Sequence, residues 1–164
     1  MAGTISISNT GASSEEIVIE ILPQLKALLG DERDEIACMA NIAAVLQEVF
    51  HFHWIGFYRV QGNELVLGPF QGPVACTRIS YGKGVCGTSW AQNATLVVDD
   101  VDAFPGHIAC SALSKSELVV PLRDANGNVK AVLDIDSERH AAFDEGLKSG
   151  MEEICALLSK QMYR

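Results

Sequence analysis

Residues 117–135 read ELVVPLRDANGNVKAVLDI, and this stretch decides the fold. Two apolar segments, Glu117 to Leu122 and Val129 to Ile135, have the length and the β-branched content of strands. Between them lies Asn126-Gly127, a dipeptide that strongly favours a tight hairpin turn. The stretch therefore predicts a hairpin, and with it a sheet that is antiparallel at this point.

A second hairpin is predicted upstream of the first. From His53 onward, side chains that alternate between two faces of a strand put Trp54, Gly56, Tyr58 and Val60 on one face. Gln61-Gly62-Asn63 then turns the chain into a strand from Glu64 to Phe70. Residues 71–104 are rich in glycine and hold one convincing strand, Thr95 to Val98, so we expect loops and short helix over the sheet.

Helices are predicted at both ends of the chain. Ser13-Ser14-Glu15-Glu16 has the pattern of a capping box and opens a helix that Pro23 is expected to disturb. Apolar residues at spacings of three and four predict a second helix from about Glu32 to Phe50 and a last one from about Asp144. Helices that enclose mostly antiparallel strands indicate an α+β, helix-on-sheet architecture.

Length and charge exclude several classes of protein. The chain has 164 residues, 48% of them hydrophobic, which suits one domain with one sizeable core. A formal charge of −9 without a basic cluster argues against nucleic acid and against anionic membranes as partners. The first residues lack the pattern of a signal peptide, and no apolar run reaches the roughly 18 to 20 residues that span a bilayer. We therefore expect a soluble, cytoplasmic protein.

The five cysteines fall into two groups. Cys38 and Cys155 lie on the predicted helices and are expected to be inert, whereas Cys76, Cys86 and Cys110 lie in or beside the glycine-rich middle of the chain. Reactive thiols favour loops and helix starts, where they can ionise and reach a substrate. The nearest cysteines are ten residues apart, so the sequence predicts no metal site of the closed zinc type.

Two of these thiols have neighbours of chemical interest. Cys86 belongs to YGKGVCGTSW, residues 81–90, where glycines and a helix start can present free N–H groups to a carboxylate, although a tight turn with a buried thiol fits equally. Cys110 follows His107, whose imidazolium can lower a thiol pKa, although a loop histidine without a catalytic part is an equal alternative.

Three acidic residues stand out on the central strands. Glu117 opens an apolar strand, and period two puts Asp134 and Asp136 on one face of theirs. Buried carboxylates cost desolvation unless they are paired, hydrogen-bonded or protonated, and proximity raises the pKa of one of them. Such a group suits proton donation or capture of an ammonium, whereas a solvated strand end is the simpler interpretation of Asp136.

Three segments together resemble a known family, the free-methionine-(R)-sulfoxide reductases, which are single GAF domains. They are GPVACTRISYGKGVCGTSW (72–90), DAFPGHIACSALSKSELVVPL (102–122) and VLDIDS (132–137). The likeness runs from about Glu35 to Leu158 and implies a GAF-type domain over 31–164, preceded by an N-terminal extension or helix over 1–30. It also implies a central antiparallel sheet with helices packed on it and long pocket-forming loops.

The resemblance implies a division of labour among the thiols. Cys110 is the thiolate that attacks the sulfoxide sulfur and becomes a sulfenic acid, and Cys76 is the thiol that resolves it as a disulfide. Cys86 is an alternative or relay thiol, or helps to close the pocket. Thioredoxin with NADPH is then the external reductant, and no bound cofactor is expected.

The same resemblance assigns the substrate pocket. Glu117 and Asp136 are the first choices for the proton donor to the sulfoxide oxygen, and with Asp134 they hold the substrate ammonium. Trp54 and Tyr58 are expected to wall the methyl group, with a plain core role as the alternative. A nucleophile and an acid on opposite sides of one small site are what sulfoxide reduction needs.

Two rival functions use the same domain differently. One is a non-catalytic GAF module that binds a small ligand, and the other is a thiol redox sensor for peroxide. The rivals differ from the reductase in whether free methionine-(R)-sulfoxide is turned over. GAF domains often pair through terminal helices, so a homodimer is a further expectation.

Overall fold

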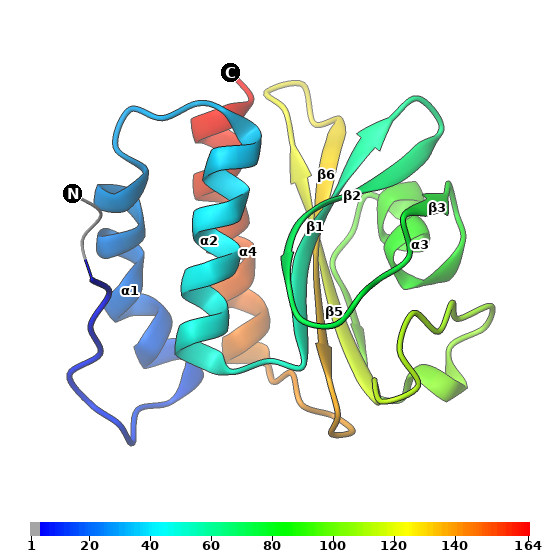
Figure 1. The fold of residues 1–164 in the computed structure, drawn as a ribbon, viewed down its shortest axis with the longest axis horizontal. Helices are drawn as coiled ribbons and strands as arrows, with labels where there is room; N and C mark the ends of the chain where they lie inside the picture. The colour runs from blue at the N-terminus through cyan, green and yellow to red at the C-terminus, as the bar shows by residue number, and fades with distance from the viewer. Residues whose placement is uncertain (1–3) are drawn as a thin grey trace.

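The computed structural model describes residues 4–164, which form six strands and four α-helices (Figure 1). The strands are β1 (Trp54–Gln61), β2 (Glu64–Gln71), β3 (Arg78–Ser80), β4 (Leu96–Val98), β5 (Ser116–Arg123) and β6 (Val129–Ser137). The helices are α1 (Ser14–Leu29), α2 (Glu35–Phe50), α3 (Gly84–Gln92) and α4 (Glu145–Met162), with a 3-10 turn at Val101–Ala103. The strands form one sheet in the order β3-β2-β1-β6-β5-β4, and neighbours run antiparallel. The predicted α+β class is confirmed.

One face of the sheet is covered by helices. α2 and α4 pack on it and α1 lies outside them, while α3 and the long loops lie on the opposite face (Figure 1). The strands turn apolar side chains toward the helices, and these belong to one buried cluster with the helical residues. Its fully buried strand members include Ile55, Phe57, Leu118, Leu122, Leu133 and Ile135. The alternation predicted for β1 is therefore confirmed, and it leaves the other face free for chemistry.

α1 corrects the expectation of a helix disturbed at Pro23, because it runs unbroken from Ser14 to Leu29. Proline has no backbone N–H, so Pro23 cannot donate to the carbonyl of Ile19, four residues earlier in the helix. Pro23 and Ile19 are both exposed, so water can bond that carbonyl instead. The predicted capping box is present, with the Ser13 hydroxyl accepting from Glu16 N at 3.2 Å. Residues 1–3 of the predicted N-terminal extension lie outside the described residues.

The stretch from 71 to 104 holds one strand more than predicted. β3 has three residues, of which Ile79 alone is buried, and it pairs with β2 at the edge of the sheet. So short a segment shows no alternation, which is why the sequence pattern missed it. The expected short helix is α3, and the expected strand near Val98 is β4.

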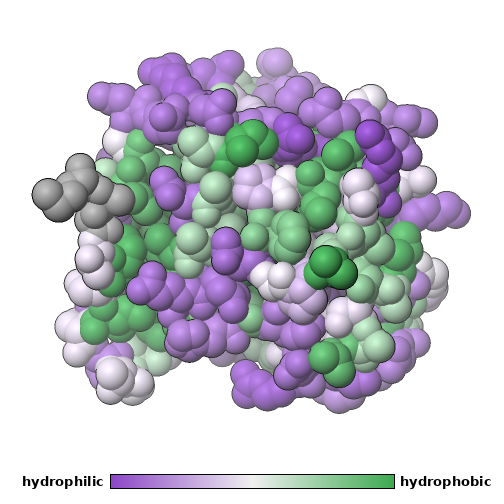
Figure 2. All heavy atoms as spheres, in the orientation of Figure 1, coloured by the Kyte–Doolittle hydropathy of each residue, from purple (hydrophilic) through white to green (hydrophobic). Residues whose placement is uncertain are grey.

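The surface mixes polar and apolar side chains. Figure 2 shows mostly polar rims, with apolar residues exposed on both the helical side and the side with the loops. Within the part of the chain that the structure describes, no helix has the length and hydropathy needed to cross a membrane.

The contact between α1 and α4 depends on a glycine. A Cβ at Gly150 would lie 2.6 Å from Val18 Cγ2, so the two helices would have to separate. We expect Gly150→Ala to lower the free energy of unfolding by about 1–3 kcal/mol, although alanine favours a helix more than glycine does. Urea unfolding measures the change.

Gly146→Ala on the same helix is the matched control, because its Cβ would meet Glu15 Cβ at 3.3 Å, where little has to move. A Gly150→Ala protein as stable as the wild type would show that α1 does not dock through this contact.

Candidate active site

The register of β1, β6 and β5 puts Glu117, Asp134 and Asp136 on one face of the sheet. Helices α1, α2 and α4 lie on the opposite side of the sheet. Asp136 pairs with Trp54 on one side and with Glu117 on the other, and Asp134 pairs with Gly56. Directly paired residues in neighbouring strands point to the same face. The carboxylates therefore project together with the Trp54 ring, as period two predicted for Asp134 and Asp136.

These side chains line a pocket together with residues of α3 and of two loops. It encloses about 540 Å³, including its open mouth. The predicted site residues that line it are Trp54, Tyr58, Cys86, Cys110, Glu117, Asp134 and Asp136. Cys76 is the one predicted site residue outside this lining. The loop residues Pro73, Val74, His107 and Ile108 and the helix residues Gly84 and Val85 also line it.

Cys76 and Cys110 form a disulfide at the edge of the pocket. They are 34 residues apart in sequence, and their Cα atoms lie 5.6 Å apart. Cys110 is exposed and Cys76 half-buried, whereas Cys86 is free and buried. The chain is thus in an oxidised form, with the pairing that the family resemblance implied.

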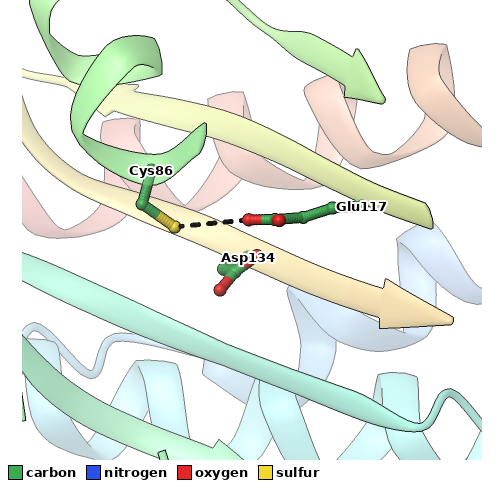
Figure 3. A group of neighbouring side chains, drawn as sticks. All are labelled: Cys86, Glu117 and Asp134. Carbon is green, nitrogen blue, oxygen red and sulfur yellow. Dashed lines mark hydrogen bonds between the residues drawn. The ribbon is translucent and has the colours of Figure 1, made fainter. Parts of the chain in front are cut away.

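Cys86 lies against two carboxyl groups (Figure 3). Its thiol donates to Glu117 Oε1 at 3.8 Å, and burial, together with the charges of Asp134 and Glu117, raises its pKa well above the ordinary value. Cys86 therefore holds its proton at neutral pH. In this form of the protein it is a hydrogen-bond donor rather than a thiolate.

The carboxyl groups also favour their neutral forms. Burial first, and then the charge of Asp136, raises the pKa of Glu117 to about 8. Burial raises the pKa of Asp134 well above its ordinary value, and Glu117 adds to the effect. The pKa of Asp136 is raised by burial and by Asp134. A protonated carboxyl at neutral pH is what a proton donor requires.

Donor atoms of Cys86, Glu117 and Asp134 lie within 4.8 Å of one another, close enough to converge on a metal ion. The raised pKa values of all three groups mean that a cation would first have to displace protons. The donor set therefore suits proton handling better than metal binding. Among the described residues, Asp134 Oδ1 is buried without a hydrogen-bond partner, and it marks a place for a donor from a ligand.

Trp54 and Tyr58 of β1 hydrogen-bond the loop that carries Cys76. Trp54 Nε1 donates to the Pro73 carbonyl at 3.0 Å, and the Tyr58 hydroxyl donates to the Cys76 carbonyl at 2.9 Å. Their rings stack with centroids 6.0 Å apart and line the pocket while belonging to a buried apolar cluster. Trp54 and Tyr58 are thus both pocket-lining and core residues. No sequence pattern predicted their hydrogen bonds to the loop that carries Cys76.

Two polar neighbours of the acids escaped the sequence interpretation. His107, for which an effect on the Cys110 thiol and an uninvolved loop position are equal alternatives from the sequence, has its Nε2 atom 3.6 Å from Glu117 Oε2. Ser114 is buried and hydrogen-bonds Asp136, which lowers the pKa of that carboxyl against the raising effect of burial. Ser114 lies among several serines, and nothing in the local sequence distinguishes it.

The start of α3 supplies free backbone donors at the pocket. Lys83 precedes the helix, and no described side chain caps it. Gly84 has a φ of +62°, and a Cβ there would press on Ile108 at 3.2 Å, so glycine lets the loop close on the helix. Unpaired N–H groups at a helix start favour an anion, such as a substrate carboxylate.

Comparison with known proteins defines the class. The GAF domain family model matches residues 34–162, and the six-stranded antiparallel sheet with its helices is the fold of a GAF domain. GAF domain-containing protein A of Dictyostelium discoideum is 53% identical over 96% of this chain and 99% of its own length. The free methionine-R-sulfoxide reductase of Escherichia coli is 42% identical over 88% of each chain.

A solved structure agrees with the sequence matches. The free methionine-R-sulfoxide reductase from Neisseria meningitidis, in complex with its substrate, has a TM-score of 0.90 and 48% identity, covering 96% of this chain and 95% of that one. The chain belongs to the GAF-domain family of free methionine-R-sulfoxide reductases, as the three sequence segments indicated.

The raised pKa of Glu117 links stability to pH. Between about pH 4.3, the pKa of an unfolded glutamate, and about pH 8, the folded protein keeps a proton that the unfolded chain has released. Stability therefore falls with rising pH over this window. Glu117→Gln cannot ionise, so we expect it to gain stability over the wild type, on the order of a few kcal/mol at pH 8 and none at pH 4.

Chemical unfolding at several pH values measures the difference. Glu48→Gln, at an exposed position on α2, is the control and is expected to follow the wild type. A difference between Glu117→Gln and wild type that stays constant from pH 4 to pH 8 would contradict a proton held by Glu117.

Proposed function

We propose that the protein is an oxidoreductase that reduces free L-methionine-(R)-S-oxide to L-methionine. The observation that carries the proposal is the Cys76–Cys110 disulfide at the edge of a pocket lined by carboxyl groups of raised pKa. The names of the Escherichia coli and Neisseria meningitidis relatives support the choice of substrate.

The reaction balances with two thiols. The Cys110 thiolate attacks the sulfoxide sulfur while a carboxyl proton goes to the oxygen, and methionine leaves as Cys110 becomes a sulfenic acid. The Cys76 thiol then attacks the Cys110 sulfur, giving the disulfide and releasing the oxygen as water. Glu117 suits the donor role because its pKa of about 8 keeps it protonated at neutral pH, and Asp136, whose pKa is also raised, is the alternative donor. The thiols supply both electrons, so no bound cofactor is needed.

The pocket offers a partner for each part of the free amino acid. Asp134 Oδ1, which lacks a partner among the described residues, accepts from the substrate ammonium, with Asp136 beside it. The N–H groups at the start of α3 receive the carboxylate. Trp54 and Tyr58 wall the methyl group. A peptide-bound sulfoxide has neither free charge and would have to pass its chain through the loops.

Thioredoxin is the proposed external reductant. The disulfide joins two loops whose exposed apolar side chains, Val74 (88% exposed), Ile108 (38%) and Leu113 (57%), offer a surface to a protein dithiol. Cys86 is the alternative or relay thiol of this scheme. A cytoplasmic location suits a thiol enzyme that needs continual reduction. Pairing into a homodimer stays a prediction, which analytical ultracentrifugation tests.

We expect NADPH oxidation in a coupled assay with thioredoxin and thioredoxin reductase when free methionine-(R)-sulfoxide is added. Cys110→Ser should abolish turnover, and Cys76→Ser should stop after one reduction per chain. Cys155→Ala, a buried position on α4 outside the pocket, is the control and should keep most of the rate.

Several outcomes would redirect the assignment. Full activity in Cys110→Ser would contradict the nucleophile, and normal cycling in Cys76→Ser would pass the resolving role to Cys86. Equal turnover of peptide-bound sulfoxide would refute the closed pocket. Ligand binding without turnover would favour the non-catalytic module, and oxidation by peroxide alone would favour the redox sensor.

The rate of sulfoxide reduction should fall as the pH rises through about 8, because Glu117 then loses the proton that it donates. Single-turnover mixing of reduced protein with substrate, followed by quantification of methionine, isolates this step. Glu117→Gln should be slower by about 10²–10⁴-fold, the usual contribution of a general acid. A rate that keeps rising to pH 9 would mean that another group supplies the proton.

A further inference from the structure

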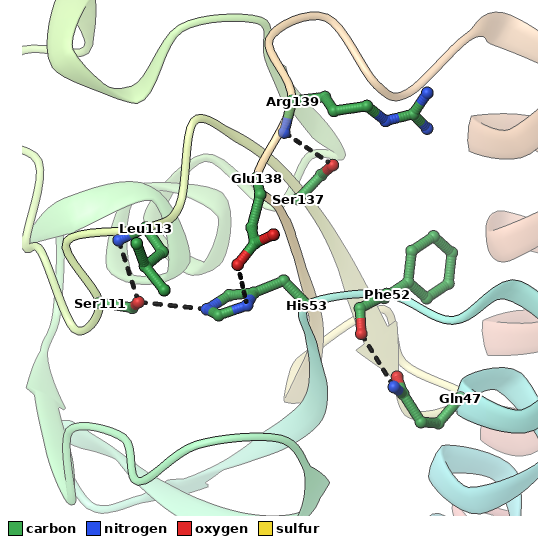
Figure 4. Close-up of polar contacts among 8 residues, drawn as sticks. All are labelled: Gln47, Phe52, His53, Ser111, Leu113, Ser137, Glu138 and Arg139. Atoms are coloured by element: carbon green, nitrogen blue, oxygen red, sulfur yellow. Dashed lines mark hydrogen bonds and ion pairs between the residues drawn. The ribbon is translucent and has the colours of Figure 1, made fainter.

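The side chains of Ser111, His53 and Glu138 form a hydrogen-bonded chain (Figure 4). His53 Nε2 lies 3.2 Å from the hydroxyl of Ser111, the residue after Cys110. His53 Nδ1 lies 3.2 Å from Glu138 Oε1. The His53 side chain is 10% exposed and that of Glu138 is 58% exposed, so a largely buried ring has a partner at each of its two nitrogens.

The contacts of Ser111, His53 and Glu138 fit one arrangement of hydrogen-bond donors and acceptors. In a neutral His53 ring, the Glu138 carboxylate, which can only accept, takes the proton on Nδ1 and leaves Nε2 as an acceptor. The Ser111 hydroxyl then donates to Nε2, while its oxygen accepts from Leu113 N at 3.2 Å. Glu138 thus selects the tautomer of His53 that receives the Ser111 hydroxyl.

Two of the three residues lie at the ends of strands. His53, in the middle of the hydrogen-bonded chain, directly precedes β1 beside Trp54, and Glu138 directly follows β6, two residues from Asp136. The turn before His53 is fixed by Gln47, whose amide donates to the Phe52 carbonyl at 2.8 Å (Figure 4).

The Cys110 segment itself has few such anchors. Its backbone bonds are local, as between Cys110 N and the Ile108 carbonyl, and the residue is exposed. The bond from Ser111 to His53 reaches across 58 residues of sequence to the sheet. It therefore joins the loop of the nucleophile to the strands that carry the pocket.

We propose that His53 is a positioning residue, which through Ser111 holds Cys110 over the pocket and near Cys76. The catalytic consequence rests on the proposed function. An untethered loop would spread Cys110 over many positions, and the Cys76 thiol would meet it less often. The tether raises the effective concentration of one thiol at the other, which speeds the resolving step and favours the disulfide.

The first test needs no substrate. Equilibration of the protein with reduced and oxidised glutathione gives the effective concentration of the Cys76–Cys110 pair, with the disulfide quantified by mass spectrometry. We expect Ser111→Ala and His53→Gln to lower it about tenfold, the effect of one hydrogen bond of ordinary net strength. Ser111→Thr keeps the hydroxyl and should stay within about twofold of wild type, as should the control His140→Gln at an exposed histidine.

Two results of this test would overturn the tether. One is a wild-type value in Ser111→Ala, and the other is an equal loss in Ser111→Thr and Ser111→Ala, which would mean that side-chain packing rather than the hydroxyl matters. The double variant His53→Gln with Ser111→Ala gives a further test. Because the two residues make one link, it should lose no more than either single variant, and losses that multiply would show that they act separately.

Turnover of free methionine-(R)-sulfoxide supplies the second test. We expect Ser111→Ala to lower kcat about tenfold with KM within about twofold, because Ser111 lines the pocket but the carboxyl groups and the backbone N–H groups that are proposed to hold the substrate charges stay unchanged. A raised KM with unchanged kcat would contradict a positioning role. If the wild type itself does not turn over, the proposed function fails while the glutathione measurement still decides the tether.

Discussion

The structure depends on the register of β1, β6 and β5. This register determines which side chains of the three strands face the helices and which lie on the side of the pocket. Ile55, Leu133 and Leu118 face the helices, and their sequence neighbours face the pocket. A slip of one residue would bury Asp134 and Asp136 among the helices and turn leucines toward the pocket. The cost of burying carboxylates in an apolar core thus fixes the same register that builds the site.

That register places acids where water is scarce. Glu117 and Asp134 are 6% and 7% exposed, and close carboxylates in a buried site cannot all ionise. In the proposed reaction these carboxyl groups supply the proton for the sulfoxide oxygen. Their raised pKa values also make the fold less stable as the pH rises. The helix-covered face compensates, because it holds a large apolar core without a role in chemistry. Because the two lie on opposite faces, one sheet carries both a site whose buried carboxyl groups destabilise the fold and an apolar core that stabilises it.

Local patterns predicted those parts of the molecule that local physics determines. The Asn126-Gly127 turn, the alternation in β1 and the shared face of Asp134 and Asp136 follow from period and turn chemistry. β3 and the unbroken α1 did not follow, since a three-residue strand has no pattern and the cost of Pro23 depends on what surrounds it. The residues that hydrogen-bond the site residues could not be predicted from local patterns either. Residues 53 and 111, or 114 and 136, are joined by the topology and have no shared signal in the sequence.

The three thiols of the middle segment, Cys76, Cys86 and Cys110, differ in exposure and in surroundings. Their place in or beside the glycine-rich middle of the chain separated Cys76, Cys86 and Cys110 from the two helical cysteines, but only the family resemblance ranked Cys110 above Cys86. Exposure and charge now give a physical basis for that ranking. Cys86 is buried against carboxyl groups that disfavour its thiolate, whereas Cys110 is exposed and bonded to Cys76 in a loop that a protein dithiol can approach. Thiol exchange requires a thiolate and access to the sulfur, so electrons that enter from solution meet the Cys76–Cys110 pair first. Cys86, on the inner wall, is better suited to donate a hydrogen bond to Glu117 than to carry those electrons.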